Sequence, residues 1–506
     1  MAADGGIGIA TRPAQGVRAW LDAPLSGWAC LLGWTLATAL FAVFVTSLGG
    51  FSLSDSYQSV FTTALLAHGQ FACSFPAGFH VTAPLYPLLS SAIASVDHVG
   101  SHVPFPSRAV MGPRCDAAFP AVNAWSSSAG ILENTERIGY LGWLALMGGI
   151  VAFLRSSGRG RCGWEPATLL LVACAAPVWV CVQSTFHPED LLAMGLALGA
   201  LACARRGSWA AAGLLIGLAF LSQQYSLLVA VPLFFLAPAT WRFSYVWSAA
   251  LTVAVVAIPL VVVTSGSAAH FILLGTGTTG GVGGALLWQA GFHGNLLLVV
   301  SRGLPLLIAG AVAWVAARRL GPRALEPVPL LSVVAVSLAL RLVFEQQIFL
   351  YYFMALTVAL LLLAVIRGRF SGALVAWLLL VPTVFVGEIS GFSALDAPLR
   401  LTVLVLALGM AFRCLRRGAA HADLAPWLAV AATTVVAWSP TGYPLQLPVW
   451  FWQVVLVGWG LALAAGPLVT ALRQAEVPAT RRSFAGSLAW NGVPRPRPAA
   501  PIRIAG

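Results

Sequence analysis

The chain contains no lysine and little charge of either sign. Its 506 residues include 28 basic residues, all of them arginine, and 16 acidic residues, so only 9% of the chain is charged. A soluble protein of this length would need far more polar surface to cover its core. The arginines are scattered, often in pairs, between apolar runs. The net charge of +12 is therefore not the footprint of a nucleic-acid-binding protein, and no nucleic-acid partner is expected.

Long hydrophobic runs dominate the sequence instead. Hydrophobic residues make up 59% of the chain, and the mean hydropathy is +0.87. Many apolar runs extend over roughly 17 to 25 residues, which suits helices that cross a hydrocarbon layer about 30 Å thick. The sequence therefore predicts an all-α polytopic membrane protein. Abundant alanine and the replacement of every lysine by arginine suggest a high-GC bacterium, such as an actinobacterium, as the source.

Arginine clusters orient the predicted spans, because basic residues favour cytoplasmic loops. The N-terminal segment 1–26 is expected in the cytoplasm, and residues 27–472 form a single transmembrane domain. The tail 473–506 is rich in arginine and proline, and we expect it to be cytoplasmic and disordered. About twelve spans are predicted, near residues 27–49, 131–154, 166–184, 190–204, 246–264, 295–316, 325–344, 348–366, 370–388, 399–415, 425–439 and 449–472.

Two regions depart from this pattern of simple spans. Residues 50–130 form one large outer segment, in which 57–71 and 84–96 have the apolar spacing of interfacial helices. Residues 208–238 carry two short apolar stretches separated by SQQYS, with arginine on both flanks. They predict a broken hairpin whose two ends lie inside. The glycine-rich loop within 265–294 is interpreted as a flexible lid.

Cysteine is sparse, and two of the eight cysteines differ from the others. Six lie in or beside apolar segments, where cysteine behaves as a small hydrophobe. Cys73 and Cys115 both fall in the predicted outer segment. In an oxidising compartment they can form a disulfide, and the alternative is two free thiols.

Most ionisable residues of the apolar region are predicted at the outer ends of the spans, which favours a site there. Asp55 follows the first span directly. A carboxylate at this position can act as a general base that deprotonates an attacking hydroxyl. Alternatively, Ser54 or Asp55 caps the helix that follows.

The stretch FHPEDLLA opens a predicted helix. Pro188 suits the first turn, and Glu189 and Asp190 complement the positive end of the helix dipole. This structural account explains the acids but not His187 beside them. The three side chains could bind a cation or sugar hydroxyls, although the spacing is no metal signature. We expect no metal ion and no cofactor.

Arg341 lies inside an apolar run, with Glu345 four residues later. The two can form an ion pair within one helix, or the guanidinium can bind phosphate oxygens. Tyr351 and Tyr352 are either interfacial aromatic residues or part of the same pocket. The remaining outer candidates are Arg302 and Arg400 for phosphate and His293 for substrate.

This arrangement resembles the GT-C fold of integral-membrane glycosyltransferases over about residues 27–240. The stretch HPEDLLAMGLALGALACARRGSWAAAGLLIGLAFLSQQYSLL is similar to a segment of bacterial polyprenol-phosphate-mannose-dependent mannosyltransferases. In those enzymes a polar outer motif is followed by a helix, a basic turn and a GLLxGLA hairpin. RLVFEQQIFLYY is a looser, later similarity.

The resemblance implies an inverting glycosyltransferase at the outer face of a bacterial plasma membrane. It would move mannose or a pentose from a polyprenyl-phosphate donor to an envelope glycan or glycolipid. Asp55 would take the proton from the acceptor, and arginine or histidine would stabilise the departing lipid phosphate without a metal. Two features differ: many relatives have a lysine where this chain has Gln223 and Gln224, and many have an acidic pair where Asp55 has no acidic neighbour.

Two other function classes stay open at this point. One is a transporter or flippase for lipid-linked sugars, which would also use broken helices and intramembrane arginine. Such a protein should carry charged residues along a path to the inner side, and few ionisable residues are predicted at inner or midplane depth. The other is a catalytically inactive GT-C-like scaffold.

Overall fold

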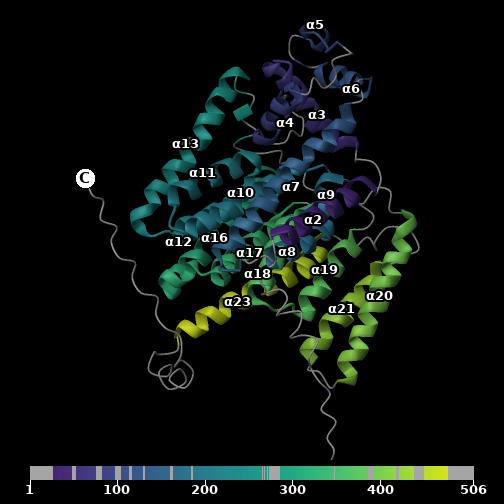
Figure 1. Cartoon of the computed structure of the whole chain (residues 1–506), viewed down its shortest axis with the longest axis vertical. Helices are drawn as coiled ribbons and strands as arrows, with labels where there is room; N and C mark the ends of the chain where they lie inside the picture. Colours follow the sequence, from purple (N-terminus) through teal and green to yellow (C-terminus); the bar gives the residue numbers. More distant parts are fainter. Residues whose placement is uncertain are drawn as a thin grey trace, which may run out of the picture.

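The computed structural model describes most of the chain, and every regular element in the described residues is a helix (Figure 1). Side chains at some helix ends, among them those of residues 53–59 and 131–138, lie outside the description. The described residues are 27–47, 53–75, 83–96, 104–112, 115, 117–128, 131–159, 163–183, 186–264, 266, 268–269, 272, 285–346, 348–385, 393–417, 421–437 and 449–476.

The elements of the first half are α2 (Gly27–Ser47), α3 (Leu53–Ala67), η1 (Phe71–Cys73), α4 (Leu85–Val96), α5 (Arg108–Met111), α6 (Ala118–Ser128), α7 (Ile131–Ser156), α8 (Trp164–Ala173), α9 (Ala176–Gln183), α10 (Pro188–Arg205), α11 (Trp209–Ser222), η2 (Gln224–Ser226), α12 (Leu227–Leu236) and α13 (Ala239–Val263). Those of the second half are α15 (Leu286–Gln289), α16 (Gly294–Leu320), η3 (Gly321–Leu325), α17 (Pro327–Phe344), η4 (Leu350–Phe353), α18 (Met354–Arg367), α19 (Gly372–Val384), α20 (Ser393–Arg416), α21 (His421–Ala437), α22 (Val449–Trp452), the π-helical turn η6 (Gln453–Val457) and α23 (Gly458–Glu476).

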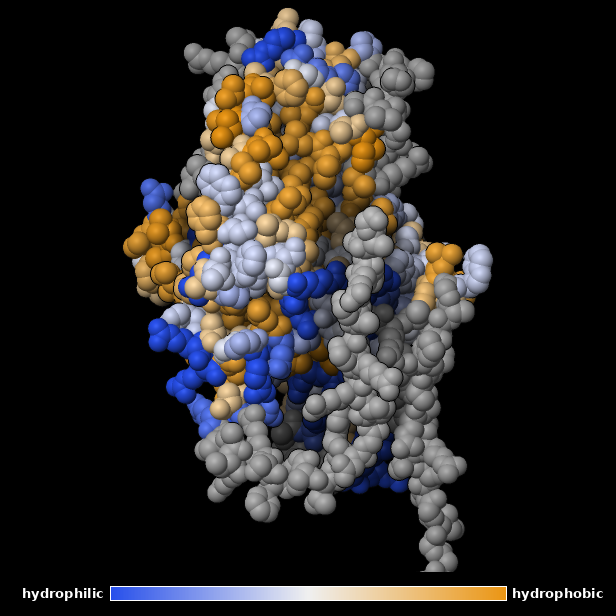
Figure 2. Space-filling model, turned by 60° about the vertical axis from the view of Figure 1, so that its left-hand side comes forward, coloured by the Kyte–Doolittle hydropathy of each residue, from blue (hydrophilic) through white to orange (hydrophobic). Residues whose placement is uncertain are grey.

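Membrane-spanning character follows from the length and hydropathy of these helices. Seven described helices are long and apolar enough to cross a membrane, or eight if the bent pair α8 and α9 counts as one span. The all-α polytopic fold is thus confirmed, while the total of about twelve spans stays a prediction. Several predicted spans correspond to helices of 10–17 residues, such as α19. Figure 2 shows broad continuous areas of hydrophobic surface on the visible face.

The helices of the bundle differ in burial: some lie in its centre, and others expose apolar side chains of the kind that contact lipid. In α18, 83% of the apolar window is buried, whereas in α13 only 6% is. α18 therefore lies inside the protein, and α13 presents Trp247, Val255 and Ile258 outward at its edge. In Figure 1, α20 and α21 lie side by side at another edge, where they pack on each other and on α19.

The outer segment folds as a small cap with its own core. α3, α5 and α6 share a hydrophobic cluster that includes Leu65, Met111 and Trp125. A disulfide joins Cys73 to Cys115 within this cluster, with the two Cα atoms 5.4 Å apart. Figure 1 shows these helices at one end of the molecule. We call α3, η1, α5 and α6 the outer cap.

Small residues bring α7 and α10 into close contact. A Cβ added to Gly195 of α10 would overlap the backbone of Ala145 in α7, and one added to Gly149 would overlap Gly195 itself. Only glycine allows two backbones to approach so closely. This crossing fixes the position of the first turn of α10, which begins with the HPED motif.

The predicted span at 166–184 is not one straight helix. The chain forms α8 and α9, which are bent by 60° at Cys174 and Ala175. Pro177 in the first turn of α9 explains the break, because proline has no N–H to donate to the carbonyl of Ala173. The bend directs the end of α9 toward the start of α10.

The broken hairpin is present between Trp209 and Leu236. Gly213 of α11 lies against Tyr245 and Ser248 of α13, and Gly217 lies against Ala249, so α11 and α13 run in the same direction. The chain must therefore reverse along α12 between them. Gln223 adopts an extended conformation and ends α11. The polar tip of the hairpin consists of residues 223–226.

Candidate functional site

Four segments from two separate parts of the chain meet at one place. They are the start of α10, the hairpin tip, the end of α17, and η4 before α18. We name the nine residues that they contribute the His187–Arg341 cluster. Its members are His187, Glu189, Asp190, Gln223, Tyr225, Arg341, Glu345, Tyr351 and Tyr352.

His187 is held in place on two sides. Its Nδ1 donates to Glu189 Oε1 at 2.8 Å, and its ring stacks on Tyr351 with the centroids 4.2 Å apart. Phe186 before it has a left-handed backbone with φ of 52°, which costs a residue with a side chain about 1–2 kcal/mol. Such conformations concentrate at functional sites, where the surroundings enforce them.

The two acids of the HPED motif are buried at the first turn of α10. Glu189 is 1% exposed and Asp190 is 3% exposed. Their backbone carbonyls accept hydrogen bonds from the hairpin tip: Ser222 Oγ donates to Glu189 at 2.9 Å and Tyr225 Oη to Asp190 at 2.7 Å. The hairpin is thereby fastened to the start of α10.

Each buried carboxylate keeps one oxygen without a hydrogen-bond partner among the described residues, namely Glu189 Oε2 and Asp190 Oδ1. Gln223 lies against the Asp190 carboxylate, and Arg341 interacts with it electrostatically. A buried acceptor without a donor costs about 1–3 kcal/mol. Both oxygens therefore keep an unused acceptor position inside the cluster.

Arg341 is the central cation of the cluster. Its Nε lies 3.3 Å from Glu345 Oε2, and its Cζ lies 5.0 Å from the ring centroid of Tyr225 and 4.9 Å from that of Tyr352. Both distances are within the roughly 6 Å reach of a cation–π contact. The Arg341 side chain is 20% exposed and that of Glu345 is 18% exposed. The ion pair, one of the two alternatives offered by the sequence, therefore exists, with Glu345 just beyond the end of α17. Part of the Arg341 side chain stays accessible.

A buried amide supports the end of α17. Gln453 is 1% exposed, and its Nε2 donates to the carbonyls of Glu345 at 2.6 Å and of Leu342 at 3.3 Å. Its Oε1 accepts from the Leu286 N–H at 2.8 Å. Gln453 thus satisfies carbonyls that have no partner inside α17, since the last turn of a helix leaves them free.

The other predicted candidates take different places. Arg302 is exposed, and its Nη1 donates to Gln224 Oε1 at 3.3 Å, so it lies at the hairpin tip beside the cluster. His293 is exposed and directly precedes α16. Its ring packs edge-to-face on that of Trp288, with the two centroids 4.3 Å apart. Arg400 is 2% exposed in α20, which packs mainly on α19 and α21, and it stands apart from the cluster.

Asp55 lies in the first turn of α3, and its side chain is outside the described residues. Because α3 begins at Leu53, Ser54 and Asp55 lie inside the helix, and the interpretation of either as its N-cap is wrong. The role of Asp55 as a general base stays a prediction. The helix that carries it is connected to the cluster through α4, which packs on α3 and also on α10 and α11. Tyr86 of α4 is buried, packs edge-to-face on Phe186 with the centroids 6.5 Å apart, and interacts electrostatically with Glu189.

Sequence reasoning did not select Tyr86, Tyr225 or Gln453. A signal existed for Tyr225, because it stands in the polar break of an apolar hairpin. Gln453 is a single amide in the apolar run VWFWQVVLV, which also marks it as unusual. No local signal places Tyr86 near Glu189, because their proximity depends on how α4 packs on α10.

The cluster combines the partly exposed Arg341 with a histidine and the two buried carboxylates of the HPED motif. A guanidinium suits phosphate oxygens, and carboxylates suit sugar hydroxyls. Among the residues that the structure describes, no three His, Cys, Asp or Glu side chains are arranged to hold a metal ion. The described chemistry is that of a site for an anionic, hydroxyl-rich ligand.

Residues 138–344 match the family model of glycosyltransferase family 87, a family of membrane glycosyltransferases of the GT-C type. The match confirms the resemblance to GT-C glycosyltransferases over these residues, which are 207 of the 506. It includes the HPED motif, the hairpin and Arg341, whereas Asp55 lies before it. No curated protein and no solved structure gives a significant match to the chain.

Proposed function

Because residues 138–344 match glycosyltransferase family 87, we propose that this protein transfers a sugar, mannose or a pentose, from a polyprenyl-phosphate donor. The acceptor is a glycan or glycolipid of the cell envelope. The reaction takes place at the outer face of a bacterial plasma membrane, and both chain termini lie in the cytoplasm.

The observation that carries this proposal is the placement of Arg341. Its guanidinium lies between the rings of Tyr225 and Tyr352, so its position is fixed before a ligand arrives. The Asp190 carboxylate interacts with it electrostatically, and Glu189 is the neighbour of Asp190 in the first turn of α10. In the proposed complex, Arg341 binds the donor phosphate, and the two carboxylates accept hydrogen bonds from the sugar hydroxyls.

The proposed reaction is a single displacement. Asp55 takes the proton of the acceptor hydroxyl as the hydroxyl oxygen forms a bond to the anomeric carbon. The bond between that carbon and the phosphate oxygen breaks, and its electron pair leaves with the polyprenyl phosphate. Arg341, with Arg302 nearby, stabilises the added negative charge on the phosphate. The anomeric configuration is inverted.

The test is transfer of radiolabelled sugar from synthetic polyprenyl-phosphate mannose and polyprenyl-phosphate arabinose by the purified full chain. Asp55→Asn should lower transfer by at least about 100-fold, the usual contribution of a general base. Asp423→Asn, at an exposed aspartate in the first turn of α21, is the matched control and should transfer normally. Transfer from neither donor by the wild-type chain would overturn the donor assignment.

A further inference from the structure

A small cavity lies at the end of the bundle opposite the His187–Arg341 cluster. Its volume is about 170 Å³, and it is lined by the end of α16, η3, the start of α17, the end of α18 and one side of α23. The cluster adjoins the end of α17 and the start of α18. Since α18 has 14 residues and rises about 1.5 Å per residue, the cavity and the cluster are roughly 20 Å apart. The cavity is therefore a separate place from the proposed transfer site.

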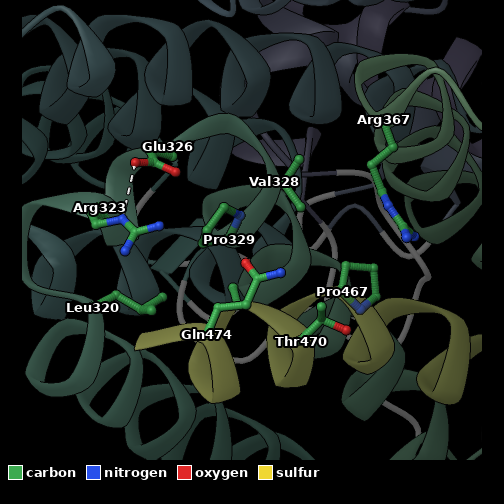
Figure 3. Close-up of a pocket in the computed structure, with 10 residues that line it drawn as sticks. Leu320, Arg323, Glu326, Val328, Pro329, Arg367, Pro467, Thr470 and Gln474 are labelled. Carbon is green, nitrogen blue, oxygen red and sulfur yellow. Dashed lines mark ion pairs between the residues drawn. The ribbon is translucent and has the colours of Figure 1, made fainter. Parts of the chain in front are cut away.

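The cavity has a basic rim and an apolar lining. Figure 3 shows Arg323 and Arg367 on opposite sides, with Pro329 and Gln474 between them. Thr470 adds a hydroxyl from α23. Such a lining suits a ligand that has an anionic group joined to apolar carbon.

Neither arginine is firmly engaged within the protein. Arg367 is exposed, and it forms no ion pair or side-chain hydrogen bond with any residue that the structure describes. Arg323 lies 3.5 Å from Glu326, and the two side chains are 48% and 54% exposed. An exposed pair of this kind is weak. Both guanidinium groups therefore keep donors for an external anion.

A second hollow of about 110 Å³ shares Arg367 with the first. Its lining is largely aliphatic and includes Leu360, Leu363, Leu374 and Leu463, with Arg369 and Ser371 at its edge. Arg367 thus lines both hollows. A phosphate held by Arg367 would place the carbon chain attached to it against these leucines, which is the order of groups in a phospholipid.

Other arginines gather at this end of the bundle. Arg155 forms two hydrogen bonds with the buried Glu165, and Arg205 donates to the Leu325 carbonyl at 3.0 Å. These two stabilise the fold, whereas Arg367 is not used in this way. The same concentration of arginine predicts that this end faces the cytoplasm. Basic pockets between helices on that side commonly bind anionic lipid headgroups.

We propose that the two hollows bind one anionic phospholipid of the inner leaflet. The phosphate lies between Arg323 and Arg367, and the first part of an acyl chain lies along the leucines of the second hollow. The small volumes agree with this assignment, because sites for drug-sized ligands have about 300–1,000 Å³.

The test is native mass spectrometry of the purified full chain with phosphatidylglycerol and with zwitterionic phosphatidylethanolamine. The wild-type chain should bind phosphatidylglycerol more tightly, and Arg367→Gln or Arg323→Gln should weaken that binding by about five-fold each. Glu326→Gln should strengthen it, because it removes the carboxylate that competes for Arg323. Arg416→Gln, at an exposed arginine of α20, is the matched control and should bind as the wild type does.

Three results would overturn the proposal. The first is equal binding of the two lipids by the wild-type chain. The second is a loss of binding in Arg416→Gln as large as that in Arg367→Gln, which would indicate a general effect of charge. The third is displacement of phosphatidylglycerol by equimolar soluble glycerol phosphate, because the ligand would then be a soluble phosphate. Unaltered thermal unfolding of each variant confirms that its fold is intact.

Discussion

Replacing Arg341 by lysine separates the two interpretations of this residue. Arg341→Lys keeps a positive charge near Glu345, but it replaces the planar fork of five N–H donors by a compact ammonium group. If Arg341 serves only the ion pair with Glu345, lysine is an adequate substitute. If Arg341 binds the donor phosphate through two parallel hydrogen bonds, lysine loses one of them.

The expected loss can be worked out from the contacts. The cation–π contacts with Tyr225 and Tyr352, at 5.0 and 4.9 Å, are retained in part by an ammonium group. One hydrogen bond to a charged group contributes about 1.5–3 kcal/mol. At about 1.4 kcal/mol for each factor of ten, its loss should lower kcat/KM by about 10- to 150-fold.

The assay is the initial rate of sugar transfer at donor concentrations below KM. Arg155→Lys is the matched control, because Arg155 also forms a carboxylate pair, with Glu165 at 2.7 Å, at the other end of the bundle. Its kcat/KM should stay within about three-fold of the wild-type value. A change of that size corresponds to a loss of transition-state stabilisation below about 1 kcal/mol. An equally small change in Arg341→Lys would refute the phosphate contact and leave the ion pair as the whole role of Arg341.

Three further predictions concern the fold around the site. Gly195→Ala should lower the free energy of unfolding by about 1–3 kcal/mol, because the added Cβ overlaps the backbone of α7. A Cβ at Gly148 has no atom within 4 Å, so Gly148→Ala should not lower the free energy of unfolding in the same thermal-unfolding experiment. Replacing Cys73 and Cys115 together by serine opens a link of sequence separation 42, and it should destabilise the outer cap by up to about 4 kcal/mol. Faster proteolysis within residues 104–128 would show this, and Cys203→Ser should leave the rate unchanged. Gln453→Leu removes the hydrogen bonds to the Leu342 carbonyl of α17 and to the Glu345 carbonyl just after it. It should cost about 1–3 kcal/mol, measured as a lower Tm, and an unchanged Tm would contradict the support assigned to Gln453.

Much of the fold could be predicted because each signal is local. The apolar runs determine where the long helices lie, and Pro188 with two acids marks the start of α10 within a few residues. The SQQYS break between two apolar stretches predicts the hairpin correctly, since an extended Gln223 ends α11. The 60° bend between α8 and α9 was missed, although Pro177 carries the reason for it.

The candidate site could be predicted only as a set of residues that share a depth in the membrane. His187 lies far in the sequence from Arg341 and Tyr351, and their meeting depends on the packing of α10 against α17 and η4. The aromatic partners of Arg341 come from the hairpin tip and from η4, which no sequence periodicity relates. For the same reason Arg400 shares the predicted outer depth of Arg341 and yet lies in a different part of the bundle.

The central claim is that Asp55 takes the acceptor proton while the His187–Arg341 cluster holds the donor. The most direct measurement is a single-turnover experiment with Asp55→Asn, in which binding of labelled polyprenyl-phosphate mannose or arabinose and formation of product are followed in the same sample. The account predicts normal donor binding and a transfer rate at least about 100-fold below that of the wild type. Normal binding followed by transfer at the wild-type rate would contradict the role of Asp55 as the base.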